Sequence, residues 1–190
     1  MLTQQKYVTE NQAREIMGSS IFGSAEIALC FKKKLPPWKI PFSETTLERH
    51  KDTHILTAVL PRSIQGMRKR FPIGSMVADG ARKILRASAP IGWHLVRMDH
   101  LPCSLGQSWT SQKSILGPEE QVACAPLMVY IIACHHFISG ERLFERTSVR
   151  CAEPHLVVGF YNTSQGWTIY VEERLNKGDL GVGIATSVRY

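Results

Sequence analysis

The sequence lacks an apolar run long enough to cross a membrane. Its longest run, from Ala123 to Cys134, is interrupted by Pro126 and is much shorter than the roughly 20 residues that a membrane-spanning helix needs. The first 18 residues also lack the apolar stretch of a secretory signal peptide. These absences predict a cytoplasmic protein with no membrane partner.

Cysteine is sparse and is not arranged in pairs. The five cysteines are odd in number and have no C-x-x-C spacing, so the sequence predicts neither a disulfide framework nor a zinc ribbon. Cys124 and Cys134 lie inside the apolar run, where a free thiol packs as a small hydrophobic group. We therefore expect buried, unreactive thiols.

Motifs for catalysis or cofactor binding are also absent. No serine stands in G-x-S-x-G, and the glycines of 178–183 lack the Lys-Ser/Thr ending of a phosphate-binding loop. Such glycines are more typical of strand positions that another group approaches closely. His94, His100 and Cys103 match no standard zinc finger and supply only three ligands. The sequence thus assigns no catalytic residue, no metal site and no cofactor.

Positive charge is abundant and unevenly distributed. The chain has a net charge of +7, and residues 51–100 hold nine Lys or Arg against three Asp. Clustered positive charge attracts phosphates and acidic surfaces, so we predict a small binding protein whose partner is nucleic acid or an acidic protein. A solvated basic face is the alternative, and it leaves the protein with no assignable biochemical function. The candidate binding residues are Arg62, Arg68, Lys69, Arg70, Arg82, Lys83 and Arg86.

An enzyme with its site near His135–Arg142 is an alternative from a different class. The adjacent histidines His135 and His136 are followed by Glu141, and such groups can perform acid–base chemistry. Neighbouring residues on a helix point about 100° apart, so the two imidazoles cannot face one ion together. We expect one histidine to be buried near a helix end and the other to be solvated.

The N-terminal part, residues 1–50, has the signals of short helices. Thr9 and Gln12 have the spacing of a capping box, and the helix that they open is expected to end at Gly18. A second helix is predicted over 24–33, and Ser43 can cap a third.

The mixed basic part, residues 51–100, alternates between strand and helix signals. Residues 54–60 and 92–98 are rich in β-formers and predict two strands. Helices are predicted between them, over 63–70 and 76–87.

A long central helix is predicted over 118–139. Pro118 suits a first helical turn, Gly140 suits a left-handed cap, and apolar residues surround the helix axis. Pro126 is expected to bend this helix.

The C-terminal part, residues 146–190, is β-rich. Four strands are predicted, over 146–152, 155–161, 167–172 and 181–189, with a hairpin between the second and third. The predicted fold is a single α+β domain over 1–190. It has a mainly antiparallel sheet of five or six strands packed on the central helix, with short helices at the N-terminus.

Several stretches of the chain are distinctive in combination: AREIMGSSIFGSAEIA, PFSE, HILTAVLP, GWHLVR, GERLFERTSVRC and LGVGIATSVR. In this order they resemble a group of uncharacterised bacterial hypothetical proteins. The resemblance implies a bacterial-type cytoplasmic protein and no particular chemistry. It is interrupted over 31–40 and 68–90, as a local shift of reading frame would interrupt it. On that hypothesis much of the basic cluster is accidental and its functional interpretation weakens, and 71–90 packs less completely than the central helix.

Overall fold

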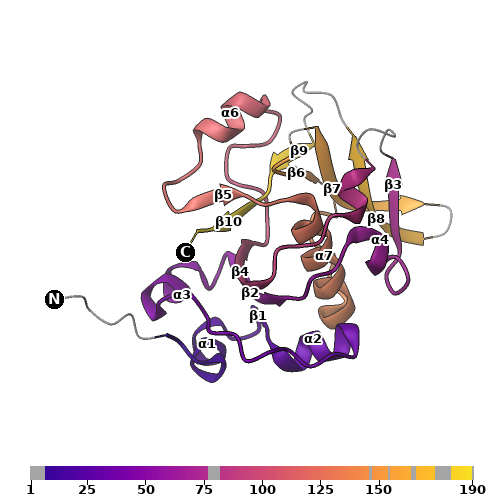
Figure 1. The fold of residues 1–190 in the computed structure, drawn as a ribbon. Coiled ribbons are helices and arrows are strands. Elements are labelled where there is room, and N and C mark those ends of the chain that lie inside the picture. Colours follow the sequence, from indigo (N-terminus) through magenta and orange to yellow (C-terminus); the bar gives the residue numbers. More distant parts are fainter. Residues whose placement is uncertain are drawn as a thin grey trace.

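The computed structural model describes residues 7–76, 82–145, 147–153, 155–163, 166–173 and 181–189. These residues form seven helices and ten strands, and the strands make two five-stranded sheets. Helix α7 (Ala125–Ser139) lies between the sheets, with the N-terminal helices beside them (Figure 1). The α+β class is therefore confirmed. The expected single sheet of five or six strands is instead two mixed sheets.

The first sheet contains the two strands predicted within 51–100. Its central strands pair antiparallel, from His54 opposite Arg97 to Val59 opposite Gly92. All six residues of the strand His54–Val59 are buried. In sheet order the strands are β1 (Ile21–Phe22), β2 (His54–Val59), β4 (Gly92–Arg97), β10 (Thr186–Val188) and β5 (Glu120–Val122), with β1 parallel to β2.

The second sheet is built mainly from the C-terminal part. The predicted hairpin is confirmed, and its pairing continues to Thr163 opposite Gly166, so both strands are longer than expected. The pairs β3–β8 and β6–β9 are parallel. In sheet order the strands are β3 (Ile73–Met76), β8 (Gly166–Glu173), β7 (Leu156–Thr163), β6 (Ser148–Arg150) and β9 (Val182–Ile184).

The stretch predicted as one strand over 181–189 joins the two sheets. Strand β9 belongs to the second sheet and β10 to the first, and Ala185 lies between them. The Ala185 N–H donates to the carbonyl of Arg150, and its carbonyl accepts from the Ala123 N–H, both at 3.0 Å. One residue therefore forms hydrogen bonds with segments associated with both sheets.

Close approach at one C-terminal glycine follows the expectation from sequence. A Cβ added at Gly183 would lie 2.4 Å from the Cβ of His100. No larger residue fits there unless the backbone moves.

The three N-terminal helices form as predicted. They are α1 (Glu10–Met17), α2 (Ser24–Phe31) and α3 (Glu44–His50). Thr9 and Gln12 make both hydrogen bonds of a capping box, and the Ser43 hydroxyl accepts from the Thr46 N–H at 3.1 Å. Local capping chemistry is sufficient to locate these helix starts.

The two helices predicted between β2 and β4 are shorter than expected. Helix α4 covers only Ile64–Met67 and α5 only Lys83–Arg86. Met76 belongs to β3, so the prediction of a helix from 76 is wrong there, and 77–81 lie outside the described residues. A further helix, α6 (Trp109–Ser114), was not predicted.

Packing in this region bears on the reading-frame hypothesis. Phe71 and Ala89 are buried, whereas α5 has no buried residue and its Ile84 and Leu85 are only partly buried. The segment therefore contributes to the core at both its ends and less through α5. The hypothesis stays a prediction.

The central helix begins later than predicted. Residues 120–122 form β5, which pairs antiparallel with β10, and Cys124 is the N-cap of α7. Pro126 consequently lies in the first turn, where its missing N–H breaks no helical hydrogen bond, so it does not bend the helix. Gly140 ends the helix in the left-handed region, at φ 77°, as predicted.

Helix α7 is buried on all sides along most of its length. Every residue from Ala125 to His135 is buried. A helix that is apolar all round belongs in the interior, and this part of the prediction is confirmed.

Truncation of a side chain at the centre of α7 should be costly. Ile131 is 1% exposed, so Ile131→Ala is expected to lower the free energy of unfolding by about 2–5 kcal/mol. The matched control is Ile91→Ala, because Ile91 is 56% exposed and should change stability by about 0.5 kcal/mol or less. Urea unfolding of both variants measures the difference, and equal losses would contradict the central role of α7. Leu175, in a predicted turn, lies outside the described residues.

Candidate functional site

Three segments without acidic residues meet around α7. Residues 27–38, 61–76 and 82–91 contain ten Lys or Arg and no Asp or Glu. The second and third segments carry the helices α4 and α5, and the first begins within α2, after Glu26; each of these helices contacts α7, and α4 also contacts α5. The ten side chains, called the basic surface below, are Lys32, Lys33, Lys34, Arg62, Arg68, Lys69, Arg70, Arg82, Lys83 and Arg86.

The seven residues predicted from sequence come from two of these segments, which the backbone ties together. Ser63 and Ser88 form an isolated antiparallel bridge, and the Ala89 N–H donates to the carbonyl of Arg62 at 2.9 Å. Arg62 is half-buried, while the other six side chains are exposed. The structure thus places the flanks of α4 and α5 next to each other.

The end of α2 adds a third basic segment that the sequence reasoning missed. Arg70 donates through Nη2 to the carbonyl of Leu29 at 2.7 Å, and the Arg62 guanidinium lies 5.6 Å from the ring centre of Phe31. Lys32, Lys33 and Lys34 follow directly and are exposed. The run of three lysines was visible in the sequence, but the charge count over 1–50 balanced it against five glutamates.

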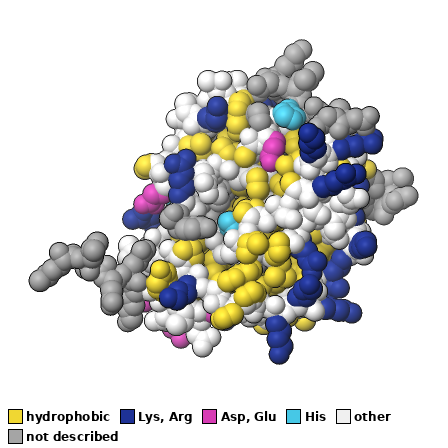
Figure 2. Space-filling model, in the orientation of Figure 1, with side chains coloured by type: hydrophobic (Ala, Val, Ile, Leu, Met, Phe, Trp, Pro, Cys, Tyr) yellow, Lys and Arg dark blue, Asp and Glu magenta, His cyan; other side chains and the backbone are white. Residues whose placement is uncertain are grey.

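One face of the molecule shows this charge directly. In Figure 2, Lys and Arg side chains gather along the right-hand side, beside an apolar patch, over the region where α2 and α4 lie in Figure 1. Few acidic side chains are visible on this side. The arrangement favours an extended anionic partner over a small ion, because the cations are spread over three segments.

The region 135–142 serves mainly to end α7. His135 is buried, and its Nδ1 lies 3.2 Å from the Ser139 hydroxyl and 3.4 Å from the carbonyl of Glu141. Burial lowers the pKa of His135, so the buried imidazole is favoured in its neutral form. His136 is half-buried, and the side chain of Glu141 is 79% exposed. One histidine is buried as expected. These contacts give no support to an acid–base site, and the enzyme alternative stays a prediction.

The candidate metal ligands are not gathered into a site. Among the described residues, no three His, Cys, Asp or Glu side chains are placed to hold one metal ion. His94 contacts the carbonyl of Pro90 through Nε2 at 3.0 Å, while Nδ1 of His100 lies 2.7 Å from the carboxylate of Asp99.

Three of the five thiols are buried as expected, although a hydrogen bond with Cys134 lowers the pKa of Cys30. Cys30, Cys134 and Cys151 are buried and Cys124 is half-buried, whereas Cys103 is exposed. Burial raises the pKa of Cys134 and of Cys151, which disfavours the reactive thiolate.

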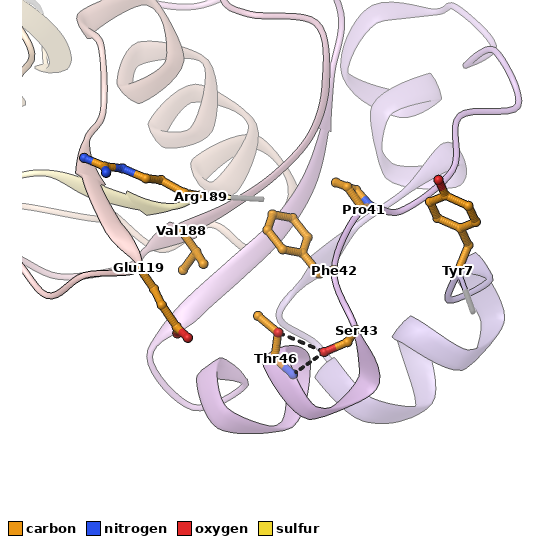
Figure 3. Close-up of a pocket in the computed structure, with 8 residues that line it drawn as sticks. All are labelled: Tyr7, Pro41, Phe42, Ser43, Thr46, Glu119, Val188 and Arg189. Atoms are coloured by element: carbon orange, nitrogen blue, oxygen red, sulfur yellow. Dashed lines mark hydrogen bonds between the residues drawn. The ribbon is translucent and has the colours of Figure 1, made fainter. Parts of the chain in front are cut away.

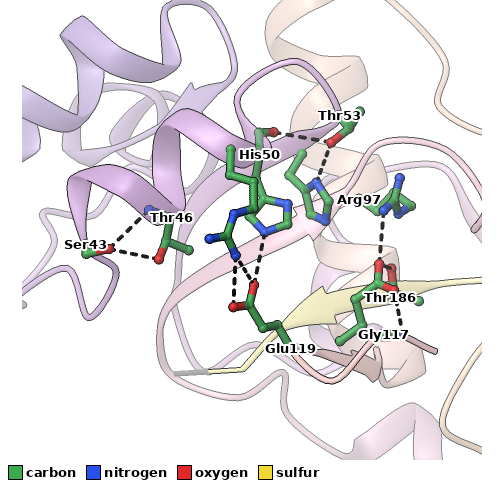
Figure 4. Close-up of polar contacts among 11 residues, drawn as sticks. Ser43, Thr46, His50, Thr53, Arg97, Gly117, Glu119 and Thr186 are labelled. Carbon is green, nitrogen blue, oxygen red and sulfur yellow. Dashed lines mark hydrogen bonds and ion pairs between the residues drawn. The ribbon is translucent and has the colours of Figure 1, made fainter.

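A second polar cluster, made of two histidines and two ion pairs, lies where strands of the first sheet begin and end (Figure 4). Arg49 donates to both carboxylate oxygens of Glu119, at 2.9 and 2.7 Å, and Arg97 donates to Glu120 at 3.0 Å. His50 has its Nε2 3.9 Å from the Glu119 carboxylate. No spacing in the sequence indicates this cluster, because its members come from α3, β2, β4 and the segment around β5.

His54 is the most deeply buried member of this cluster. It is 0% exposed, its Nδ1 contacts the Thr53 hydroxyl at 2.8 Å, and its Nε2 has no hydrogen-bond partner among the described residues. Its ring lies 4.4 Å from that of His50. Burial, with smaller contributions from His50 and Arg97, lowers the pKa of His54 from 6.5 to about 3. The group is therefore neutral in the folded protein near pH 7.

A cavity of about 370 Å³ opens beside this cluster (Figure 3). Some of its polar groups are already engaged: Glu119 pairs with Arg49, and the Ser43 hydroxyl contacts the Thr46 hydroxyl and N–H. Tyr7 and Arg189 add polar lining, and Phe42 and Val188 supply apolar lining. One basic side chain lines the cavity, whereas the basic surface holds ten, so the basic surface is the stronger candidate for an anionic partner.

Comparisons with known proteins identify no relative: no family model, no curated protein and no solved structure matches the chain. The resemblance to bacterial hypothetical proteins accordingly stays a prediction. Within the described part of the chain, no helix combines the length and apolar character required to cross a membrane.

The buried histidine makes stability depend on pH. The pKa of His54 is about 3 when folded and near 6.5 when unfolded, so the unfolded chain binds the extra proton between these values. Neutral His54 therefore favours the folded state fully above about pH 6.5. As the pH falls toward 3, the free energy of unfolding decreases by up to about 1.4 kcal/mol per pH unit. Urea unfolding between pH 4 and 7 should show this slope.

Replacing His54 shows how much of the pH dependence of stability comes from this histidine. His54→Gln should flatten the dependence on pH, whereas His155→Gln should leave it unchanged, because His155 is exposed. If wild type and His54→Gln lose stability in parallel as the pH falls, another group is responsible.

Proposed function

We propose that the protein is a binding protein and that its basic surface contacts the phosphates of a nucleic acid. The observation that carries the proposal is the meeting of three acid-free segments around α7. Lysines and arginines bind a phosphate backbone through charge and counterion release, without reading the base sequence. Such binding needs neither a deep pocket nor a cofactor.

The aromatic residues beneath the cations favour a nucleic acid over an acidic protein. Phe31 stacks on Tyr130, with ring centres 5.1 Å apart, and Phe71 meets Phe31 edge-on at 5.8 Å. Phe71 and Tyr130 are buried, whereas Phe31 is half-buried and its ring centre lies 5.6 Å from the Arg62 guanidinium. A cation beside a partly exposed ring is typical of nucleic-acid-binding surfaces, whereas an acidic protein would require charge alone.

Charge reversal on the basic surface should weaken binding and reduce its dependence on salt. Lys69→Glu combined with Lys83→Glu changes two exposed side chains, one in each of two segments. If both contact phosphates, the affinity for a fluorescent 20-nucleotide single strand should fall at least tenfold at low salt, and the slope of log K against log salt should shrink by about 1.4. Fluorescence anisotropy across a salt series measures both quantities.

The matched control is Lys39→Glu combined with Lys113→Glu. Both lysines are exposed and lie outside the basic surface, so this variant changes the net charge equally and should bind more tightly than the first variant. Equal losses in the two variants would mean that only net charge matters. Absence of binding at low salt would overturn the proposal, and polyglutamate that competes as well as the oligonucleotide at equal charge would indicate an acidic protein partner instead.

A further inference from the structure

One aromatic side chain in the last turn of α7 is exposed. Phe137 is 49% exposed, although it lies only two residues after the fully enclosed stretch. Leu29 on the neighbouring α2 is 64% exposed. Arg70 connects them: its guanidinium lies 5.0 Å from the ring centre of Phe137, and its Nη2 donates to the carbonyl of Leu29.

The ring of Phe137 has a firm support. Phe71, which is buried, meets it at 5.9 Å with the ring planes at 86°. Phe71 in turn contacts Phe31, which stacks on the buried Tyr130. The exposed ring is therefore the outer member of an aromatic series anchored in the core, so little conformational freedom is lost when a ligand covers it.

The surroundings of this ring are cationic. Arg68, Lys69 and Arg70 follow α4 directly, and Lys32–Lys34 follow α2. No Asp or Glu occurs in either segment. An exposed aromatic ring within a positively charged surface combines the two elements that bind single strands, namely stacking and backbone attraction.

We infer that Phe137 and Arg70 form a stacking platform for an unpaired base and that the nucleic acid bound by the basic surface is single-stranded. This inference rests on the proposed function and adds its substrate class. In a duplex the base faces are covered by neighbouring base pairs, so they cannot stack on the ring of Phe137. In a single strand a base can leave the stack and lie on the ring while the adjacent phosphates contact the lysines.

Removing the ring tests the platform directly. Phe137→Ala should weaken the binding of a 12-nucleotide single strand about fivefold or more, because stacking of one base on an aromatic residue typically contributes at least that factor. Binding of a blunt duplex of the same sequence should change less than twofold. The slope of log K against log salt should stay the same, because no phosphate contact is lost.

Two further variants control for altered folding and for general loss of apolar surface. Phe137→Trp keeps a stacking ring and should bind single strands at least as tightly as the wild type. Ile91→Ala removes an apolar side chain that is 56% exposed and lies outside the platform. The affinities for the single strand and for the duplex should therefore stay unchanged. Thermal unfolding confirms that each variant is folded before its binding is measured.

The outcomes separate this inference from the proposed function. If single strand and duplex bind equally and Phe137→Ala affects neither, or affects both alike, the platform is wrong while the basic surface stands. The platform is also wrong if Phe137→Trp binds as weakly as Phe137→Ala. If neither nucleic acid binds the wild type at low salt, both proposals fail.

Discussion

The enclosure of α7 is the constraint on which the rest of the structure depends. Its first eleven residues are all buried, so no side of this stretch can face water without exposing apolar surface, at about 25 cal/mol per Å². Two sheets cover part of the helix, through β2 on one side and β7 and β8 on the other. The phenol of Tyr130 adds a polar connection, because it donates to the carbonyl of Ala58 and accepts from the Leu60 N–H.

The remaining side of α7 is covered by short helices, and this cover is also the basic surface. Ile64 and Met67 of α4, with Phe71 just after it, turn their apolar side chains inward. Helices as short as α4 and α5 are not stable by themselves, so packing on α7 holds them in place. Lysine and arginine take the exposed positions of α5 and the three positions that follow α4. The position of the proposed binding surface thus follows from the burial of the central helix.

The sequence predicts best those features that depend on interactions between residues close together in the chain. The starts at Thr9 and Ser43 were found because a side chain caps a helix three residues away. The predicted start of α7 is wrong because Pro118 and Glu119 also suit the first turn of a helix. Residues 120–122 instead form a strand, because they pair with β10, some 65 residues away in the sequence. The division at Ala185 depends on two sheets whose existence no local pattern reveals. The candidate residues around Arg68 form a cluster in the sequence itself. The lysines of 32–34 are distant from them in the sequence, and only the folded structure brings the segments that carry them together.

The distribution of acids explains why the positive charge collects on one side. Glu26 binds Arg14, Glu48 binds Lys51, and the two glutamates of the histidine cluster bind arginines of α3 and β4. These acids are used to fix the N-terminal helices and the first sheet. The acid-free stretches 27–38, 61–76 and 82–91 hold ten cations that have no acid within their own segments, so these cations repel one another. On the proposed function, an anionic chain lying across this surface would relieve that repulsion.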